Sequence, residues 1–128
     1  MLGFSSNLRY YLYCESTDMR NGFDGLAGIV RNRLLKDPVS GDVFIFVNKK
    51  RTHIKLLYWD GDGFGLFYKR LEKGRYSFLS NSTYKQLKRD ELMMLLEGLS
   101  FGEMRKKKRY KKKWFFLKKS TDIFLIIK

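Results

Sequence analysis

The sequence contains one cysteine and one histidine among its 128 residues. Cys14 cannot form an internal disulfide and has no CxxC partner, so a disulfide scaffold is excluded and a reducing compartment fits. His53 has no second histidine and no cysteine nearby, which argues against a zinc site and against a Cys–His pair. We therefore expect no catalytic residues, no bound metal and no cofactor.

Long apolar runs are also absent. Residues 1–13 hold no uninterrupted apolar block of seven or more, so we expect no secretion signal. The last apolar run, residues 123–127, is far too short to cross a bilayer. We expect a cytoplasmic protein without a membrane partner.

Acidic residues are scarce at one end of the chain. The net charge is +14, but residues 1–104 carry 16 Lys and Arg against 12 Asp and Glu, whereas residues 105–128 carry 11 against 1. We predict one domain over 1–104, followed by a basic, disordered tail over 105–128. A basic arm is a common footprint of nucleic-acid binding, and a solvated extension is the ordinary alternative.

Apolar and aromatic runs divided by turn residues predict the strands. The expected strands are Leu8–Glu15, Val43–Val47, Ile54–Trp59, Phe64–Leu71 and Tyr76–Leu79. The run Val43–Val47 is apolar on both faces, so it should be a central strand. The last four of these strands should form an up-and-down meander.

Two helices are predicted from apolar positions at helical spacing. The first begins after N-cap chemistry at residues 16–18 and presents Phe23, Leu26, Ala27, Val30 and Leu34 on one face. Glycines 22, 25 and 28 interrupt it, and close packing of the helix on the sheet would explain them. The second helix carries Leu92, Leu95, Leu96 and Leu99. The predicted fold is α+β, with a four- to five-stranded antiparallel meander and two helices packed on one face.

The turns of the meander differ in charge. Residues 48–53 and 72–75 are basic, whereas residues 60–63 are acidic. Alternate turns of a meander lie at the same end of a sheet, so the two basic turns should meet and form a grip for a phosphate backbone. The plainer alternative is that turns are polar in any case and that cations keep sheet edges soluble and unpaired.

The candidate nucleic-acid contacts are the cations of these turns, their flanking strands and the tail. They are Lys49, Lys50, Arg51, Lys55, Lys69, Arg70, Lys73, Arg75, Arg105, Lys106, Lys107, Lys108 and Arg109. Aromatic residues interleave with them, and the candidate aromatic contacts are Tyr58, Trp59 and Tyr68.

A small metal-dependent nuclease is the enzymatic alternative. It requires carboxylates that converge on one point. Asp60 and Asp62 lie in a hairpin turn, where Asp-Gly is ordinary turn chemistry, and the meander places Glu72 at the opposite end. The string DGDGFG lacks the third acidic position and the terminal Glu of a calcium loop, and it lacks the Gly-Lys-Ser/Thr ending of a P-loop.

Long segments of the chain resemble one protein family. The segments are TDMRNGFDGLAGIV (17–30), DPVSGDVFIFVNKKRTHIKLLYWDGDGFGLFYKRLEKGRY (37–76) and ELMMLLEGL (91–99). They closely resemble the TnpB-type accessory proteins, the second reading-frame products, of the sixty-six family of bacterial insertion sequences. The resemblance covers about residues 8–99.

The resemblance implies a role in DNA transposition of a mobile genetic element. Such proteins are encoded beside a separate DDE transposase, support transposition, and differ from the RNA-guided nucleases that share the TnpB name. The family-pattern positions are Asp18, Met19, Arg20, Asn48, Lys49, Lys50, Lys55, Tyr58, Trp59, Asp60, Tyr68, Lys69, Arg70, Glu72, Lys73 and Gly74. Two features depart from the pattern: His53 stands at a position that is usually charged, and the tail from about Lys111 looks foreign.

Together these observations favour a non-catalytic accessory factor that binds DNA, or a transposase–DNA complex, through the basic end of its sheet. The phosphate contacts would position the protein without reading bases. The alternative is an adaptor that docks the DDE transposase without touching nucleic acid, through an exposed aromatic patch of Tyr58, Trp59 and Phe67. Such a factor would be bacterial, cytoplasmic, and nucleoid-associated when bound to DNA. The sequence does not decide whether the ligand is DNA or RNA, or whether binding is sequence-specific. It also does not identify the surface that meets the transposase or the oligomeric state.

Overall fold

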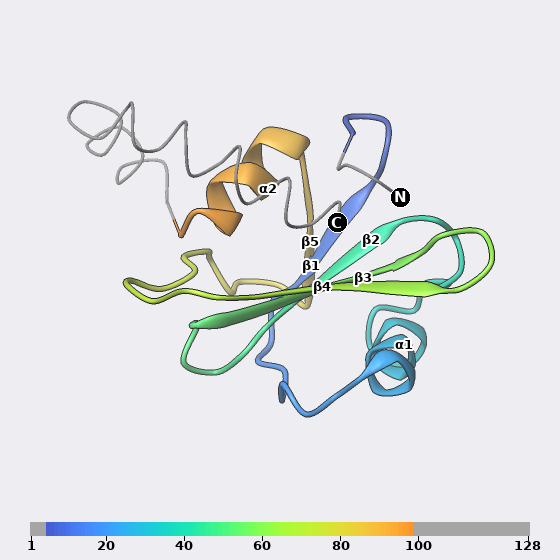
Figure 1. Ribbon diagram of the computed structural model, residues 1–128, viewed down its shortest axis with the longest axis horizontal. Helices are drawn as coiled ribbons and strands as arrows, with labels where there is room; N and C mark the ends of the chain where they lie inside the picture. The colour runs from blue at the N-terminus through green and yellow to red at the C-terminus, as the bar shows by residue number, and fades with distance from the viewer. Residues whose placement is uncertain (1–4, 99–128) are drawn as a thin grey trace.

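A five-stranded sheet lies between two helices in the computed structural model, which describes residues 5–98 (Figure 1). The strands are β1 (Tyr10–Tyr13), β2 (Val43–Val47), β3 (His53–Trp59), β4 (Phe64–Arg70) and β5 (Tyr84–Leu87). The helices are α1 (Phe23–Asn32) and α2 (Arg89–Leu96). The order across the sheet is β4-β3-β2-β1-β5, so the α+β class is confirmed.

The antiparallel meander is confirmed for three strands. β2, β3 and β4 pair in sequence, with Phe44 opposite Leu57 and Leu56 opposite Phe67. β1, in contrast, pairs with β2 in parallel, because α1 carries the chain from one strand back to the start of the next. The sheet is therefore mixed, and the expectation of a wholly antiparallel sheet is wrong.

The expected fourth meander strand, Tyr76–Leu79, is not a strand. Arg51 holds this segment instead: its carbonyl accepts from the Tyr76 N–H at 2.7 Å, and its guanidinium donates to the Phe78 carbonyl at 2.8 Å. The chain thus passes along the end of the sheet and forms β5 at the far edge, antiparallel to β1. β5, the next strand after β4 in the sequence, therefore lies at the opposite edge of the sheet from β4 (Figure 1).

The two helices cover opposite faces of the sheet, which corrects the expectation that both pack on one face (Figure 1). α2 packs over the face formed by Leu12, Val43 and Ile45, whereas α1 packs over the face formed by Phe44 and Phe46. Every residue of β1 and β2 is buried. A central strand that is apolar on both sides needs cover on both sides, and one helix supplies each.

The first helix starts later than its N-cap signal predicts. The N-cap is Gly22, without a side-chain hydrogen bond, and residues 16–18 belong to the preceding loop. Close packing on the sheet does not account for the glycines: a Cβ at Gly22 or Gly28 would meet nothing within 4 Å, and one at Gly25 would meet the Asn21 side chain. Within residues 5–98 neither helix is long and apolar enough to traverse a bilayer.

Candidate functional site

Asn48 organises the first basic turn, between β2 and β3. Its side-chain carbonyl accepts from the backbone N–H of Thr52 at 2.8 Å and from that of His53 at 3.0 Å. Its amide nitrogen lies 3.1 Å from Thr52 Oγ1 and 3.2 Å from His53 Nδ1. Asn48 thus closes the turn with both ends of its amide group, and Lys49 and Lys50 are left exposed at the tip.

The second basic turn, residues 72–75, is joined to the first by backbone hydrogen bonds. The Leu71 N–H donates to the Thr52 carbonyl at 2.9 Å, and the Tyr76 N–H donates to the Arg51 carbonyl at 2.7 Å. Gly74 has a φ of 80°, a left-handed conformation that favours glycine. The prediction that the two basic turns share one end of the sheet is confirmed.

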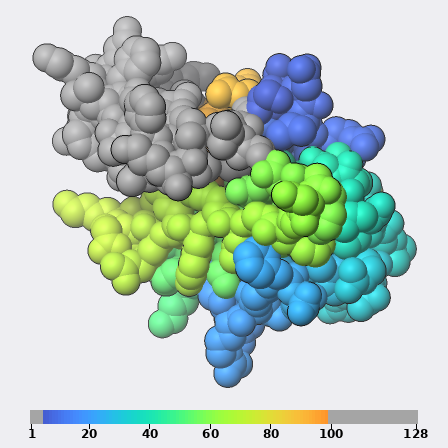
Figure 2. Space-filling model, turned by 45° about the vertical axis from the view of Figure 1, so that its right-hand side comes forward, coloured from blue at the N-terminus to red at the C-terminus, as the bar shows by residue number. Residues whose placement is uncertain are grey.

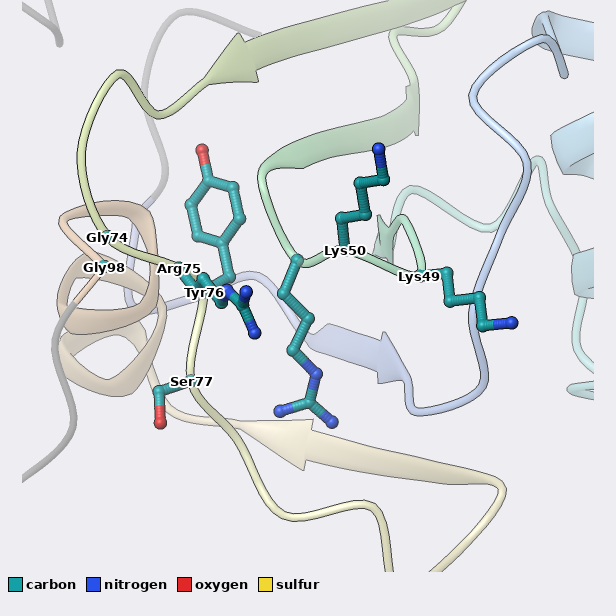
Figure 3. A pocket seen from close by; sticks show the side chains of 8 residues that line it. Lys49, Lys50, Gly74, Arg75, Tyr76, Ser77 and Gly98 are labelled. Carbon is teal, nitrogen blue, oxygen red and sulfur yellow. The ribbon is translucent and has the colours of Figure 1, made fainter.

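A hollow of about 690 Å³ lies between the two turns. Figure 3 shows Lys49 and Lys50 on one turn, and Gly74, Arg75 and Tyr76 on the other. The residues that line the hollow are Lys49, Lys50, Arg51, Gly74, Arg75, Tyr76, Ser77 and Gly98. Tyr76 is fully buried and forms part of the floor, whereas Lys49, Lys50 and Arg75 are exposed at the rim. A concave surface with exposed cations and few acids is suited to an anionic oxygen-rich ligand.

Besides Lys55, described below, three of the predicted cations have partners within the protein. Arg51 stacks on the Phe78 ring at 3.9 Å and donates to Ser80 Oγ at 3.0 Å. Arg70 pairs with Glu72 at 2.7 Å, and Lys69 Nζ donates to the Leu96 carbonyl at 3.0 Å. These cations shape the basic end, whereas Lys49, Lys50, Lys73 and Arg75 take no part in the ion pairs found among the described residues.

Lys55 is not an exposed contact, which corrects the sequence-based expectation. Its side chain lies on the α1 face and is only 6% exposed. Its ammonium donates to the Met19 carbonyl at 2.7 Å and to the Asn21 carbonyl at 2.8 Å, and it sits 4.7 Å from the centre of the Tyr68 ring. Lys55 therefore ties the loop before α1 to the sheet and is not available to a phosphate.

The loop that Lys55 holds has its own internal ion pair. Asp18 accepts from the Arg20 backbone N–H at 2.9 Å and pairs with the Arg20 guanidinium at 2.7 Å. The side-chain hydrogen bond from Arg20 lowers the pKa of Asp18 to about 2. The Asp-Met-Arg segment that carries the family resemblance thus forms a turn whose Met19 carbonyl faces the buried lysine.

The predicted aromatic contacts divide between core and surface. Tyr58 and Phe67 are half-buried and pack against the cluster beneath α2, and burial raises the pKa of Tyr58. Trp59 meets Phe64 edge-on at 5.0 Å. Tyr68 is 52% exposed, on the face opposite to Tyr58. The predicted trio of Tyr58, Trp59 and Phe67 is therefore not an exposed patch.

The acidic turn lies at the other end of the β3–β4 hairpin, as predicted. Asp60 donates its N–H to the Gly63 carbonyl at 2.8 Å, and Gly61 has a φ of 86°, so this is a tight hairpin turn. Within the described part of the chain, no three residues among His, Cys, Asp and Glu are placed to hold a metal ion. The predicted contacts Arg105–Arg109 lie outside the described residues.

Two features of the site were missed by sequence reasoning. Gly98 completes the hollow after α2, with a φ of 73° and a Cβ position 3.0 Å from Leu71 Cδ1. Ser77 lines it from the segment that was expected to be a strand. A glycine directly after an apolar helical stripe is a C-cap signal, but nothing local indicates that this helix end meets the basic turns.

Comparisons with known proteins identify relatives of the chain. Residues 8–106 match the family described as IS66 Orf2 like protein. Two similar proteins come from Sinorhizobium fredii, named "Uncharacterized protein y4jC" and "Uncharacterized protein y4hO". The first is 33% identical in a match that covers 84% of this chain and 92% of the relative's own length. The second is 38% identical in a match that covers 59% of this chain and 66% of the relative's own length. No solved structure matches the chain significantly. The chain belongs to the IS66 Orf2-like family.

Proposed function

We propose that this protein is a non-catalytic accessory factor in the transposition of a bacterial insertion sequence, and that it binds DNA through the basic end of its sheet. Membership of the IS66 Orf2-like family supports the role in transposition. The observation that carries the DNA contact is the meeting of two basic turns, distant in the sequence, around one hollow. The separate DDE transposase of the element is the proposed protein partner.

The proposed mode of binding is contact with the phosphate backbone. Lys49 and Lys50 stand at the tip of a turn that Asn48 fixes, so the backbone that carries the two lysines loses little freedom when a phosphate arrives. Arg75 lines the hollow from the facing turn, where Lys73 is also exposed. Contacts of this kind position a protein on a duplex without specifying bases, which suits a factor that supports another protein's chemistry.

Reversal of one rim charge tests this mode. We expect Lys50→Glu to weaken binding of the full chain to a DNA duplex by about tenfold or more, and to lower the slope of log K against log salt by about one. Fluorescence anisotropy over a salt series measures both quantities.

Arg31→Glu is the matched control, because it changes the net charge by the same amount on the exposed side of α1, away from the basic end. Beyond a Debye length of about 8 Å its effect on affinity should be small. Equal losses in the two variants would show that net charge, and not the basic end, governs binding.

An adaptor that docks the transposase is the second candidate, and one observation favours it. Tyr68 is a large aromatic side chain that is 52% exposed, and the Lys55 ammonium lies 4.7 Å from the centre of its ring. Rigid exposed tyrosines are frequent anchors of protein interfaces. Tyr68→Ala would weaken capture of the transposase and leave DNA affinity unchanged under the adaptor hypothesis, whereas Lys50→Glu would do the opposite under the DNA hypothesis.

A further inference from the structure

β4 is a long edge strand of the sheet. It has seven residues and borders only β3 among the described strands, at the opposite edge from β5 (Figure 1). β5 has four residues, one of them Lys85, and Lys88 follows it directly, which are features that blunt an edge. In the space-filling view, green and yellow-green atoms of the β4 region lie at the surface across the visible face (Figure 2). β4 is thus the better template for another strand.

The hydrogen-bonding pattern shows which residues of β4 face outward. Leu71 donates to the Thr52 carbonyl, and Gly63 accepts from the Asp60 N–H, so the odd-numbered residues of β4 bond to β3. In an antiparallel ladder the intervening residues point their N–H and C=O groups the other way. These residues are Phe64, Leu66, Tyr68 and Arg70, and no strand of residues 5–98 pairs with this side of β4.

We propose that the β4 edge binds a second copy of this chain, with the two β4 strands antiparallel and centred on Phe67. This register uses the whole strand and brings the outward residues of one copy opposite the outward residues of the other. Leu66 then faces Tyr68 of the second copy, and Phe64 faces Arg70. The product is a symmetric dimer in which two five-stranded sheets form one continuous sheet.

Charge complementarity supports the antiparallel arrangement. The turn before β4 is acidic, at Asp60 and Asp62, whereas the end of β4 and the turn after it are basic, at Lys69, Arg70 and Lys73. Antiparallel pairing places the acidic turn of each copy beside the basic end of the other, whereas parallel pairing would place like charges together. The register sets Asp62 opposite Glu72, the one acid within the basic turn, but Glu72 is already paired with Arg70 at 2.7 Å and four cations surround it in the sequence.

The side chains that oppose each other also suit this register. Leu66 and Tyr68 form an aliphatic–aromatic pair, and Phe64 offers its ring to a guanidinium. On the other face, Phe67 meets its own copy across the two-fold axis, and Lys69 lies opposite Gly65, whose Cβ position is covered by the Tyr58 ring of the same chain. No pair of like charges is directly opposed within Phe64–Arg70. Self-complementarity of this kind favours a second copy over an unrelated strand as the occupant.

The test compares two substitutions at Leu66 in the full chain. Leu66→Pro removes an outward N–H that has no bond to β3, and Gly65 before it has no Cβ to clash with the proline ring. Leu66→Ala trims the same side chain but keeps the N–H. Light scattering coupled to size exclusion, over about a hundredfold range of concentration, reports the mass against 15.3 kDa for one chain.

We expect the wild type to reach twice the monomer mass, Leu66→Ala to retain most of the dimer, and Leu66→Pro to raise the dimer Kd by about tenfold or more. Asp62→Lys tests the charge pairing, because it reverses a charge in the exposed acidic turn without touching the paired strand. It should also weaken the dimer, and Asp24→Lys on α1 is its matched control. Its effect should shrink at high salt.

Three results would overturn the proposal. The first is a monomeric wild-type chain at every concentration. The second is a dimer that is equally stable in Leu66→Pro and in wild type, which would place the contact elsewhere. The third is a monomer whose Leu66 and Tyr68 amides are protected from hydrogen exchange, which would show that another segment of the same chain occupies the edge.

Discussion

We expect Lys55→Met to destabilise the fold by about 2–4 kcal/mol, because it removes a buried ammonium that makes charge-assisted hydrogen bonds to two backbone carbonyls. The Met19 and Asn21 carbonyls lie 2.7 and 2.8 Å from Lys55 Nζ and lose this donor. Methionine fills nearly the same volume, so the loss reports the missing hydrogen bonds and not a cavity. Urea unfolding followed by circular dichroism measures the change in the free energy of unfolding.

Lys50→Met is the control, because Lys50 is exposed at the tip of its turn. Surface substitutions of this kind usually change stability by less than about 0.5 kcal/mol. Lys55→Arg should also destabilise, since a planar guanidinium cannot take the place of a compact ammonium between two carbonyls. A Lys55→Met variant as stable as the control would show that the loop before α1 does not depend on this anchor.

Asn48→Ala is the second substitution with a large expected effect. It leaves the N–H groups of Thr52 and His53 without the side-chain acceptor that now bonds both, at a cost of about 2–3 kcal/mol. The same change frees the turn that presents Lys49 and Lys50, so DNA affinity should fall although no charge is removed. Unfolding by urea and anisotropy of labelled DNA give the two quantities for one variant.

Asn48→Asp separates the two roles of the amide. The carboxylate still accepts from Thr52 and His53, but it no longer donates to Thr52 Oγ1 and His53 Nδ1. Its stability should therefore lie between that of Asn48→Ala and that of wild type. Unchanged DNA affinity in Asn48→Ala would mean that the shape of the first basic turn does not matter for binding.

Local sequence signals were enough to predict three strands of the meander, although the expected fourth strand, Tyr76–Leu79, is not a strand. The apolar runs of β2, β3 and β4 are separated by turn residues, and alternation of turns between the ends of a meander brought the two basic turns together. The position of β5 was not predictable in this way. Its sequence YKQL is polar, and it becomes a strand because β1 offers an open edge far away in the sequence.

Other errors arose where tertiary contacts override a local pattern. Lys55 looked like one more cation near a basic turn, yet its strand position points it to the α1 face, where two carbonyls receive it. Full burial of β2 implied cover on both faces, and that signal already argued against placing both helices on one side. The identity of the helix that covers each face depends on connections that no single segment encodes.

The central claim is that the folded domain itself, and not the basic tail, binds phosphates. The most direct test measures the anisotropy of a labelled DNA duplex with residues 1–104 over a salt series, beside the full chain. We predict that residues 1–104 bind, that log K falls linearly with log salt, and that Lys49→Glu with Lys50→Glu abolishes this binding. Binding by the full chain alone, with none by residues 1–104, would contradict the account.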